Sequence, residues 1–537
     1  MSGIVPLDRR DFLRAAGGAG VAVAASGVLV PHAGAASAEF AHGVASGDPL
    51  PDGVVLWTRV TPTPESAPGS GAGPEVTVRW EMSPDAAFST IVRDGEVVTG
   101  PDADHTVKVE ATGLEPDTWY HYRFRLGPVT SPAGRTRTAP APDAEVDGLR
   151  LGLASCSNYA AGHFAAYRHA AERGDLDLFV HVGDYLYEGG DAGVRAHRPA
   201  KEITSLADYR QRHAQYKTDP DLRALHAAVP WVATWDDHEV VNDYWEGGSG
   251  DHDPAAEGDW AARKAAGHRA YFEWMPVRRG PGGGIRRRFQ WGRLADLTML
   301  DLRGHRSEQS SEEDFDDPSR TFTGRAQMEW LKDGLSASTA QWHLIGNSVM
   351  ITPVSLQGLV KEVVDALGEL IGGGDLLAHV GPNADAWEGY QADRTDLLTH
   401  IRDAGITDTV FLTGDVHVSW ATEVSVDRTA APWHPPVATE LVCSSVTSSN
   451  LDDLLGLPPR TISRGAEGVL HLNNPYAKFC ELDSHGFVLI DVTPRRMQAD
   501  WYFVSDPEDP DATLKHGASF ASRAGTQRLH RAFTPVG

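Results

Sequence analysis

The chain has 537 residues, of which 41% are hydrophobic and 23% charged, and its formal net charge is −26. Because single hydrophobic cores stop growing at roughly 250–300 residues, this length predicts one small and one large domain. The acidic balance argues against a nucleic-acid-binding surface and favours cations gathered at a carboxylate-rich site.

The first 38 residues have the pattern of a twin-arginine export signal. Arg9 and Arg10 precede a weakly apolar Ala/Gly/Val stretch, and residues 36–38 form a small-residue cleavage site before Glu39. A generic secretory signal is the alternative. Both interpretations predict a secreted or cell-wall-associated protein, and the twin-arginine machinery would export it already folded. No apolar run reaches the ~20 residues that cross a bilayer, so no transmembrane segment is predicted.

Residues 39–137 show the sequence pattern of a β-sandwich. Short alternating segments are separated by Gly, Pro and Asp, and they predict strands at 54–60, 76–82, 105–112 and 119–126. The stretch from Leu114 to Tyr120 resembles the tyrosine corner of fibronectin type III domains, in which a Tyr hydroxyl ties a strand back to the preceding turn. The Pro/Ala-rich segment 138–146 is interpreted as a linker.

From residue 147 to 537 the pattern changes to apolar strands followed by helical stretches. Strands are predicted within 149–156, 176–184, 231–239, 295–303, 341–349 and 409–417. Several of them end in Asp, His, Asn or Cys. Since ligands bind at the carboxyl ends of buried strands, this pattern of strands and helices predicts a layered α/β enzyme domain.

Three of these strand ends carry recognisable motifs. Gly183-Asp184-Tyr185-Leu186-Tyr187 closes the first, and its aspartate is placed to bridge two metals. The second is the run Trp235-Asp236-Asp237-His238-Glu239, with Asn242 shortly after. The third is Gly414-Asp415-Val416-His417. Each motif alone is weak, because Asp and Tyr are common in loops, but the ordered combination is specific.

This order of motifs resembles the calcineurin-like metallophosphoesterases and, through the tyrosine, the purple acid phosphatases. The chain departs from the superfamily in having Asp237 for the usual Asn and Asp415 for the usual first His. Both changes replace a neutral ligand with a carboxylate. Because hard oxygen ligands favour Ca²⁺ or Mg²⁺ over Zn²⁺, the second metal is expected to be a hard divalent cation.

These departures, together with Cys156 at the end of the first strand, match the alkaline phosphatase D family. Further matching segments are FAHGVASGDP, LWTRV, WDDHEVVND, LDLRGHR and NPYAKFCE, so the resemblance covers essentially the whole mature chain. It implies a four-layer α/β sandwich of two mixed sheets flanked by helices, preceded by the fibronectin type III-like β-sandwich. It also implies ferric iron held by Cys156, Asp184, Tyr187 and His417. The same resemblance implies one or two Ca²⁺ held by Asp184, Asp237, Asn242 and Asp415.

Further site residues follow from the resemblance and from charge. His238 is expected to contact the phosphate or the leaving oxygen, and its alternative is a supporting histidine behind the ligands. Arg168 and Arg303 are candidates for clamping phosphate, because planar guanidinium pairs well with its oxygens. An ordinary salt bridge is the alternative for each arginine. Asp236 is expected to be structural, since consecutive residues of an extended chain point to opposite faces.

Two features are left with open alternatives. Apolar residues from Leu356 to Ile371 recur at helical spacing before Gly372-Gly373-Gly374, which predicts an amphipathic helix followed by a hinge. This helix is either packed on the core or a lid that senses lipid. Cys443 and Cys480 are expected to be buried thiols rather than a mutual disulfide.

The resemblance implies a metal-dependent alkaline phosphatase that hydrolyses phosphate monoesters. The metal pair would activate water, neutralise the phosphoryl oxygens and align the attack on phosphorus, so no phosphoenzyme is needed. A phospholipase D-type phosphodiesterase on the same scaffold is the first alternative, with phospholipids among its substrates. A secreted, non-catalytic binding protein that uses the sandwich for adhesion is the second.

Overall fold

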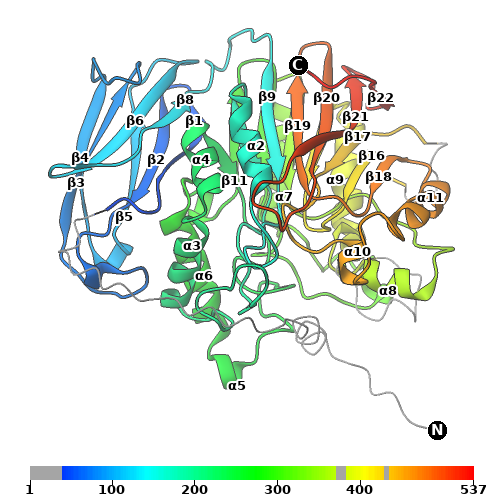
Figure 1. Ribbon diagram of the computed structural model, residues 1–537. Coiled ribbons are helices and arrows are strands. Elements are labelled where there is room, and N and C mark those ends of the chain that lie inside the picture. Colours follow the sequence, from blue (N-terminus) through cyan, green and yellow to red (C-terminus); the bar gives the residue numbers. More distant parts are fainter. Residues whose placement is uncertain (1–38, 371–382, 428–433) are drawn as a thin grey trace.

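The computed structural model describes residues 39–370, 383–427 and 434–537. The expected export signal and the three glycines after residue 371 lie outside these ranges. The described residues form two large sheets and one small sheet (Figure 1).

The largest sheet has ten strands, and Cys156 and the first two motifs follow three of them. In spatial order its strands are β22 (Leu529–Arg531), β21 (Leu514–Arg523), β20 (Arg496–Val504), β19 (Gly486–Val492), β9 (Leu149–Ala154), β10 (Leu178–His181), β11 (Trp231–Ala233), β1 (Val44–Leu50), β2 (Gly53–Arg59) and β5 (Thr106–Thr112). Strands β9, β10 and β11 run parallel, so their carboxyl ends meet at one edge. β19 runs antiparallel to β9, which makes the sheet mixed.

The second large sheet is also mixed and has seven strands. Their order is β12 (Arg287–Trp291), β13 (Ala295–Met299), β14 (Trp342–Asn347), β15 (Thr409–Thr413), β17 (Ala438–Val442), β16 (Ser419–Val424) and β18 (Ala477–Glu481). The small sheet belongs to the N-terminal sandwich. It contains β4 (Arg93–Thr99), β3 (Val76–Ser83), β6 (Trp119–Leu126), β7 (Val129–Thr130) and β8 (Gly134–Arg137).

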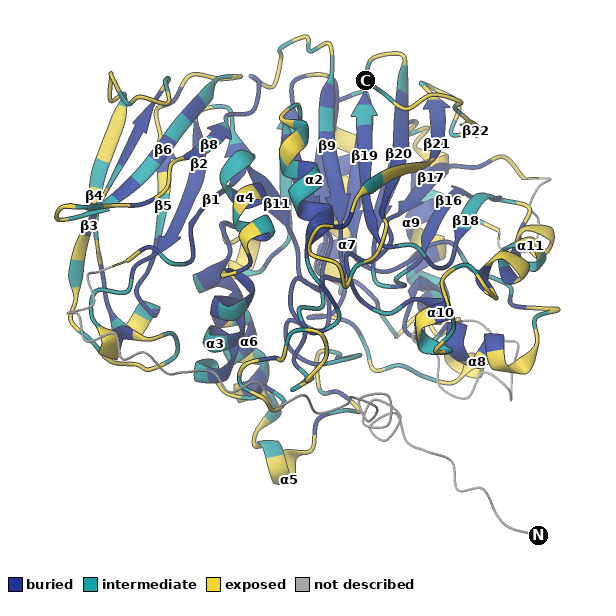
Figure 2. Ribbon diagram, in the orientation of Figure 1, coloured by how far each residue is buried: buried dark blue, intermediate teal, exposed yellow. Residues whose placement is uncertain are grey.

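Helices cover the outer faces of the two large sheets, and the apolar residues of the strands explain why. On β9, Leu149, Leu151 and Leu153 join the core between the sheets. On β19, Val488 and Ile490 enter the same core, whereas Phe487 and Leu489 pack against the outer helices. Strands that are apolar on both faces must be covered on both faces. Figure 2 shows these strands buried along most of their length. The predicted four-layer fold is therefore confirmed.

The covering helices fall into two groups. α2 (Ala165–Arg173), α3 (Leu206–Tyr216), α4 (Pro220–Ala228) and α6 (Trp260–Trp274) pack on the ten-stranded sheet. α7 (Arg325–Ala337) and α9 (Gln391–Asp403) pack on the seven-stranded sheet. The remaining helices lie at the loops: α5 (Pro254–Glu257), α8 (Lys361–Leu370), α10 (Leu451–Leu454) and α11 (Ser463–Asn473).

The N-terminal sandwich contains the predicted tyrosine corner, because the Tyr120 hydroxyl accepts a hydrogen bond from the Glu115 N–H at 3.0 Å. One feature was not predicted. β1 pairs in parallel with β11 through Gly47 and Trp231, so the ten-stranded sheet runs from the enzyme domain into the sandwich. A Cβ at Gly47 would lie 2.6 Å from the Trp231 carbonyl oxygen and would collide with the Pro276 carbonyl. This junction therefore requires glycine. The expected linker at 138–146 divides the two domains along the sequence, but one sheet continues through both domains.

Helix α8 begins later than the apolar spacing suggested, at Lys361. Val363, Val364 and Leu367 are buried in one cluster with Val416 and Val418, which flank His417 in the sequence. These contacts are those of a helix packed on the core. The three cysteines are unpaired, as expected for Cys443 and Cys480.

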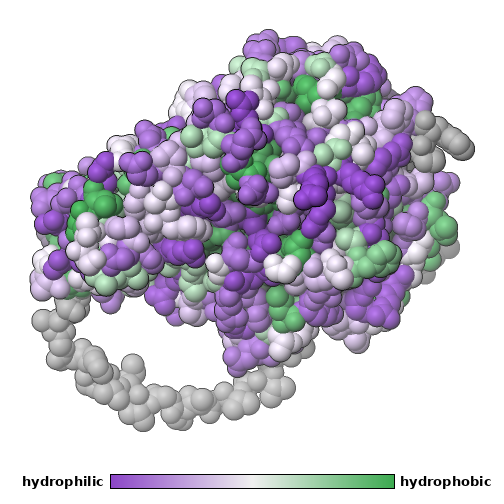
Figure 3. Space-filling model, turned by 90° about the horizontal axis from the view of Figure 1, so that it is seen from above, coloured by the Kyte–Doolittle hydropathy of each residue, from purple (hydrophilic) through white to green (hydrophobic). Residues whose placement is uncertain are grey.

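The described residues contain no helix that is long and apolar enough to cross a membrane. The face seen in Figure 3 is covered mainly by hydrophilic side chains, and its hydrophobic patches are small and separate. The apolar residues of the sheets are thus buried in the interior.

Candidate metal centre

The metal-ligand candidates lie in the turns that follow four strands of the two large sheets. Cys156, Asp184 and Asp237 follow β9, β10 and β11, while Asp415 and His417 follow β15. Four of these five residues adopt positive φ, between 55° and 67°. Positive φ is uncommon for residues other than glycine. The sharp turns aim side chains from both sheets at one place, and such strained backbone clusters at functional sites.

The first cluster joins a thiol, a carboxylate and an imidazole. Cys156, Asp184 and His417 each place one ligand atom so that all three atoms lie within 4.8 Å of one another. The Tyr187 hydroxyl is 3.1 Å from Asp184 Oδ2 and 3.1 Å from His417 Nε2. His417 Nδ1 faces the Ser449 carbonyl at 2.9 Å, so Nε2 is the nitrogen directed at the cluster. The four residues predicted as iron ligands therefore lie close together.

Two further clusters contain three of the four residues predicted for the second metal, all but Asn242. Asp184, Asp237 and His238 form one, and Asp236, Asp237 and Asp415 form the other. Since Asp184 belongs to the first two clusters, its carboxylate is placed to bridge adjacent cations.

Asn242 lies in a turn that is tied to Asp237, because the next residue, Asp243, donates its N–H to Asp237 Oδ2 at 2.7 Å. The Asn242 amide nitrogen donates to Asp251 at 2.8 Å. That bond fixes the amide orientation and leaves the carbonyl oxygen, the atom that a hard cation would take.

The electrostatics of the site fit a bound cation. Burial raises the pKa of the Cys156 thiol, the Asp184 carboxyl and the Tyr187 phenol, and nearby carboxylates raise each of them further. Burial also raises the pKa of Asp415. One Asp184 oxygen, Oδ1, is buried without a hydrogen-bond partner in the part of the chain that the structure describes. A cation would satisfy that oxygen and stabilise all four groups in their anionic form.

Arg303 is fully buried and takes part in this acidic network, which corrects its expected role. Its guanidinium makes two bonds to Asp236, at 2.6 and 2.9 Å, and one to Asp385 at 2.6 Å. Its Nη2 also lies 3.2 Å from Asp415. Because all its nitrogens already donate to carboxylates, Arg303 is not a free phosphate clamp. This pairing agrees with a structural role for Asp236.

Arg168 is likewise committed elsewhere. Its guanidinium contacts Asp221 at 3.4 Å and the carbonyl oxygens of Pro510 and Ala512. None of these partners belongs to the ligand clusters. The expected phosphate-clamp role of Arg168 is therefore dropped as well.

His238 has the geometry of a substrate-contacting group. Its Nδ1 lies 2.7 Å from a Glu188 oxygen, and its ring is 4.2 Å from the Tyr187 ring. The side chain is 19% exposed, so it remains reachable at the edge of the cluster. Burial alone would lower the pKa of His238, but the carboxylates of Glu188, Asp237 and Asp184 outweigh burial and raise it well above its usual value. An imidazole held at Nδ1 leaves its Nε2 for a hydrogen bond to a phosphate oxygen.

The sequence interpretation missed the carboxylates that support the ligands. Glu188 holds His238 and also accepts the Asn242 N–H at 2.8 Å. Glu239 accepts the N–H groups of Asp184, Tyr185 and Asp236, at 3.2, 2.6 and 2.8 Å, and so joins two ligand turns. Burial raises the pKa of Glu239 to about 8. Glu188 directly follows the first motif and Glu239 is the last residue of the second, and those positions were the signal that could have revealed their role.

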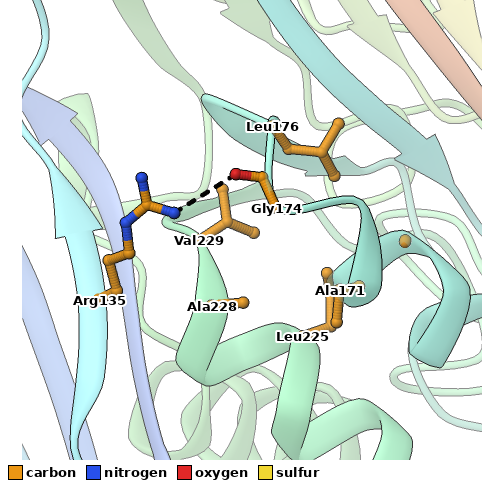
Figure 4. Close-up of a pocket in the computed structure, with 8 residues that line it drawn as sticks. Arg135, Ala171, Gly174, Leu176, Leu225, Ala228 and Val229 are labelled. Carbon is orange, nitrogen blue, oxygen red and sulfur yellow. Dashed lines mark hydrogen bonds between the residues drawn. The ribbon is translucent and has the colours of Figure 1, made fainter. Parts of the chain in front are cut away.

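A surface hollow between the sandwich and the enzyme domain is a different feature (Figure 4). Apart from Arg135 its lining is apolar or glycine, and Arg135 donates to the Gly174 carbonyl across it. None of the ligand candidates lines this hollow. It lacks the convergent polar groups of a reactive site.

Two mixed sheets flanked by helices, with thiol, carboxylate, phenol and imidazole groups at their strand ends, define a hydrolase of the metallophosphoesterase class. The sequence pattern of the PhoD-like phosphatases matches residues 151–501, and that of their N-terminal domain matches residues 23–140. The chain belongs to the PhoD-like phosphatase family and is a phosphoric ester hydrolase.

Two relatives show how far the similarity extends. The chain is 36% identical to alkaline phosphatase D of Bacillus subtilis (strain 168), over 96% of this chain and 87% of that protein. A solved structure of PhoD superposes with a TM-score of 0.80 at 35% identity, and covers 93% of this chain and 92% of that one. The family expected from the motifs is thus confirmed.

Proposed function

We propose that this phosphatase is an exported enzyme with ferric iron and calcium in its active site, and that it prefers phosphate monoesters. The observation that carries the proposal is the contact of the Tyr187 hydroxyl with both Asp184 and His417, beside Cys156. Thiolate and phenolate are strong anionic donors that favour the ferric state, and the carboxylates of Asp237 and Asp415 suit calcium.

The side chains of the site would have two roles in hydrolysis, holding the metals and contacting the phosphate. Iron would be held by Cys156, Asp184, Tyr187 and His417, and calcium by Asp184, Asp237, Asn242 and Asp415. When bound, the metal pair supplies an activated water and offsets the charge of the phosphoryl oxygens. His238, held at Nδ1 by Glu188, presents Nε2 to a phosphate or leaving-group oxygen and can give it a proton.

Metal content tests this proposal directly. The purified, folded protein is expected to contain iron and calcium and to be coloured by charge transfer from Tyr187 and Cys156 to ferric iron. Chelation at neutral pH should remove calcium first, because carboxylate-bound calcium exchanges faster than thiolate-bound iron. Elemental analysis and visible absorption check both expectations. A colourless zinc protein with full activity would refute the metal assignment.

Replacement of Asp415 tests the calcium ligand. In Asp415→His the activity is expected to depend less on calcium and to accept zinc or manganese, because imidazole suits transition metals. Iron should remain on Cys156, Tyr187 and His417. The matched control is Asp403→His, which adds a histidine away from the ligand clusters, at a side chain that is 62% exposed. Unchanged calcium stoichiometry and an unchanged activation curve in Asp415→His would remove this residue from the ligand set.

The substrate preference and the export route are part of the same proposal. Rates on p-nitrophenyl phosphate, its bis-ester and phosphatidylcholine, measured on one preparation, separate a phosphatase from a phosphodiesterase of phospholipase D type. Replacing Arg9 and Arg10 together by lysine should hold the protein in the cytoplasm if the twin-arginine route exports it. A generic secretory signal would tolerate that change.

A further inference from the structure

Lys217 is a buried amine that the metal mechanism does not use. Lys217 caps α3 and is 1% exposed, at the boundary between the sandwich and the enzyme domain. Its Nζ is 2.9 Å from the Tyr185 hydroxyl and 3.1 Å from His226 Nε2. The Tyr185 hydroxyl and His226 Nε2 are 3.0 Å apart, so the three groups close a triangle. None of these contacts pairs the amine with a carboxylate, and burial lowers the pKa of Lys217 well below its usual range.

The sandwich reaches this triangle through Trp57 of β2. The Lys217 amine lies over the Trp57 ring, 4.7 Å from its centroid. Trp57 is fully buried in a small cluster with Ala214 of α3 and Trp274 of α6. Its indole N–H donates to the Glu273 carbonyl at 2.8 Å. The side chain is therefore anchored on the enzyme domain although its strand belongs to the sandwich.

On its other side the triangle reaches the metal-bearing turn. Tyr185 stands between the ligand candidates Asp184 and Tyr187, and its own ring points away from them into the domain boundary. Its backbone N–H is fixed by Glu239 at 2.6 Å. The turn is thus held at its backbone by Glu239 and at its side chain by Lys217.

We propose that Lys217 is a positioning residue that couples the N-terminal sandwich to the metal-bearing turn 183–187, through Trp57 on one side and the Tyr185 hydroxyl on the other. The inference rests on the proposed metal site, because it assigns the sandwich the task of holding Asp184 and Tyr187 in place for the iron. Burying an amine without a charged partner is costly, and such groups persist where a specific geometry is required.

Lys217→Met tests the coupling, because methionine fills similar space without a donor. The variant is expected to lose its iron about tenfold faster than wild type, as when other groups behind metal ligands are removed. We expect kcat to fall with KM little changed, and the amides of residues 183–187 to exchange faster with solvent. The melting temperature should stay the same or rise, since a buried amine is removed. A purely structural lysine would show the opposite pattern, with lower stability and an unchanged turn.

Lys108→Met is the matched control. Lys108 also crosses the boundary from the sandwich, but it donates to the carbonyl oxygens of Phe272 and Val277 and does not touch the turn. This variant should keep the wild-type iron release and amide exchange. Tyr185→Phe should reproduce the effects of Lys217→Met, and the double variant should be no worse than either one.

The outcomes separate this inference from the metal assignment. Wild-type protein that contains another metal would refute the iron proposal, while amide exchange in residues 183–187 and the kcat of Lys217→Met would still decide the coupling. Unchanged exchange and kcat in Lys217→Met would overturn the role of Lys217. Equal effects in Lys108→Met would also overturn it, by showing a general response of the domain boundary.

Discussion

Asp184→Asn is expected to abolish nearly all phosphatase activity, with a loss on the order of 10³-fold or more, as for other directly acting groups. Asp184 belongs to two ligand clusters, and its Oδ1 has no hydrogen-bond partner among the described residues. The amide keeps the size of the side chain and can still accept from the Tyr187 hydroxyl. It removes the charge that would bridge two cations. Elemental analysis should therefore find both metals depleted.

The fold of Asp184→Asn should survive, because burial already raises the pKa of this carboxyl and a neutral amide avoids that cost. The melting temperature of the metal-free variant is expected to equal or exceed that of the metal-free wild type. Asp236→Asn is the contrasting control, since Asp236 is bound by Arg303. That variant should lose stability and keep its iron. Full activity in Asp184→Asn would exclude a bridging role.

Arg303→Met is expected to lower the free energy of unfolding of the metal-free protein by about 3–5 kcal/mol, as when one partner of a buried ion pair is removed. The substitution leaves Asp236 and Asp385 buried without the guanidinium that binds them both. It also increases the repulsion that Asp237 and Asp415 experience. Denaturant unfolding of the metal-free proteins measures the loss.

Calcium should restore part of the stability of Arg303→Met, because an ion that binds only the folded state shifts the equilibrium toward it. Arg263→Met is the control. Arg263 is also buried and pairs with Glu202 and Glu257, but these carboxylates are 32% and 14% exposed and can return to water. Its loss should be smaller and insensitive to calcium. A loss of unfolding free energy below about 1 kcal/mol in Arg303→Met would contradict this prediction, because it would show that the ion pairs of Arg303 contribute no more than pairs on a protein surface.

The parts of the site that could be predicted from sequence are those carried by local pattern. Cys156, Asp184, Tyr187 and His417 each follow an apolar strand within a few residues, and parallel strands bring their carboxyl ends together. The resemblance that these motifs carry then implied that the four residues form one group. Four strands of the sandwich, β2, β3, β5 and β6, were predicted to within about one residue because alternation and turn residues are local signals too. Strands β1, β4, β7 and β8 were not predicted.

What could not be predicted depends on partners far away in the chain. A guanidinium pairs equally well with phosphate and with carboxylate, so the sequence around Arg303 cannot reveal that it meets Asp236 and Asp385. Asp385 itself follows no periodic segment that would place it near β11. The pairing of β1 with β11 depends on close packing at Gly47, which has no periodic signature.

Strand β9 leads directly to Cys156, and it lies between β10 and β19 in the sheet. Arg150 of β9 pairs with Asp491 of β19, although 341 positions separate them. During synthesis the edge of β9 that pairs with β19 therefore stays unpaired until β19, near the end of the chain, has been made. Contacts so distant in sequence slow folding, and an open edge invites wrong pairing in the meantime. Cys156 thus reaches its final place late, after synthesis of nearly the whole chain.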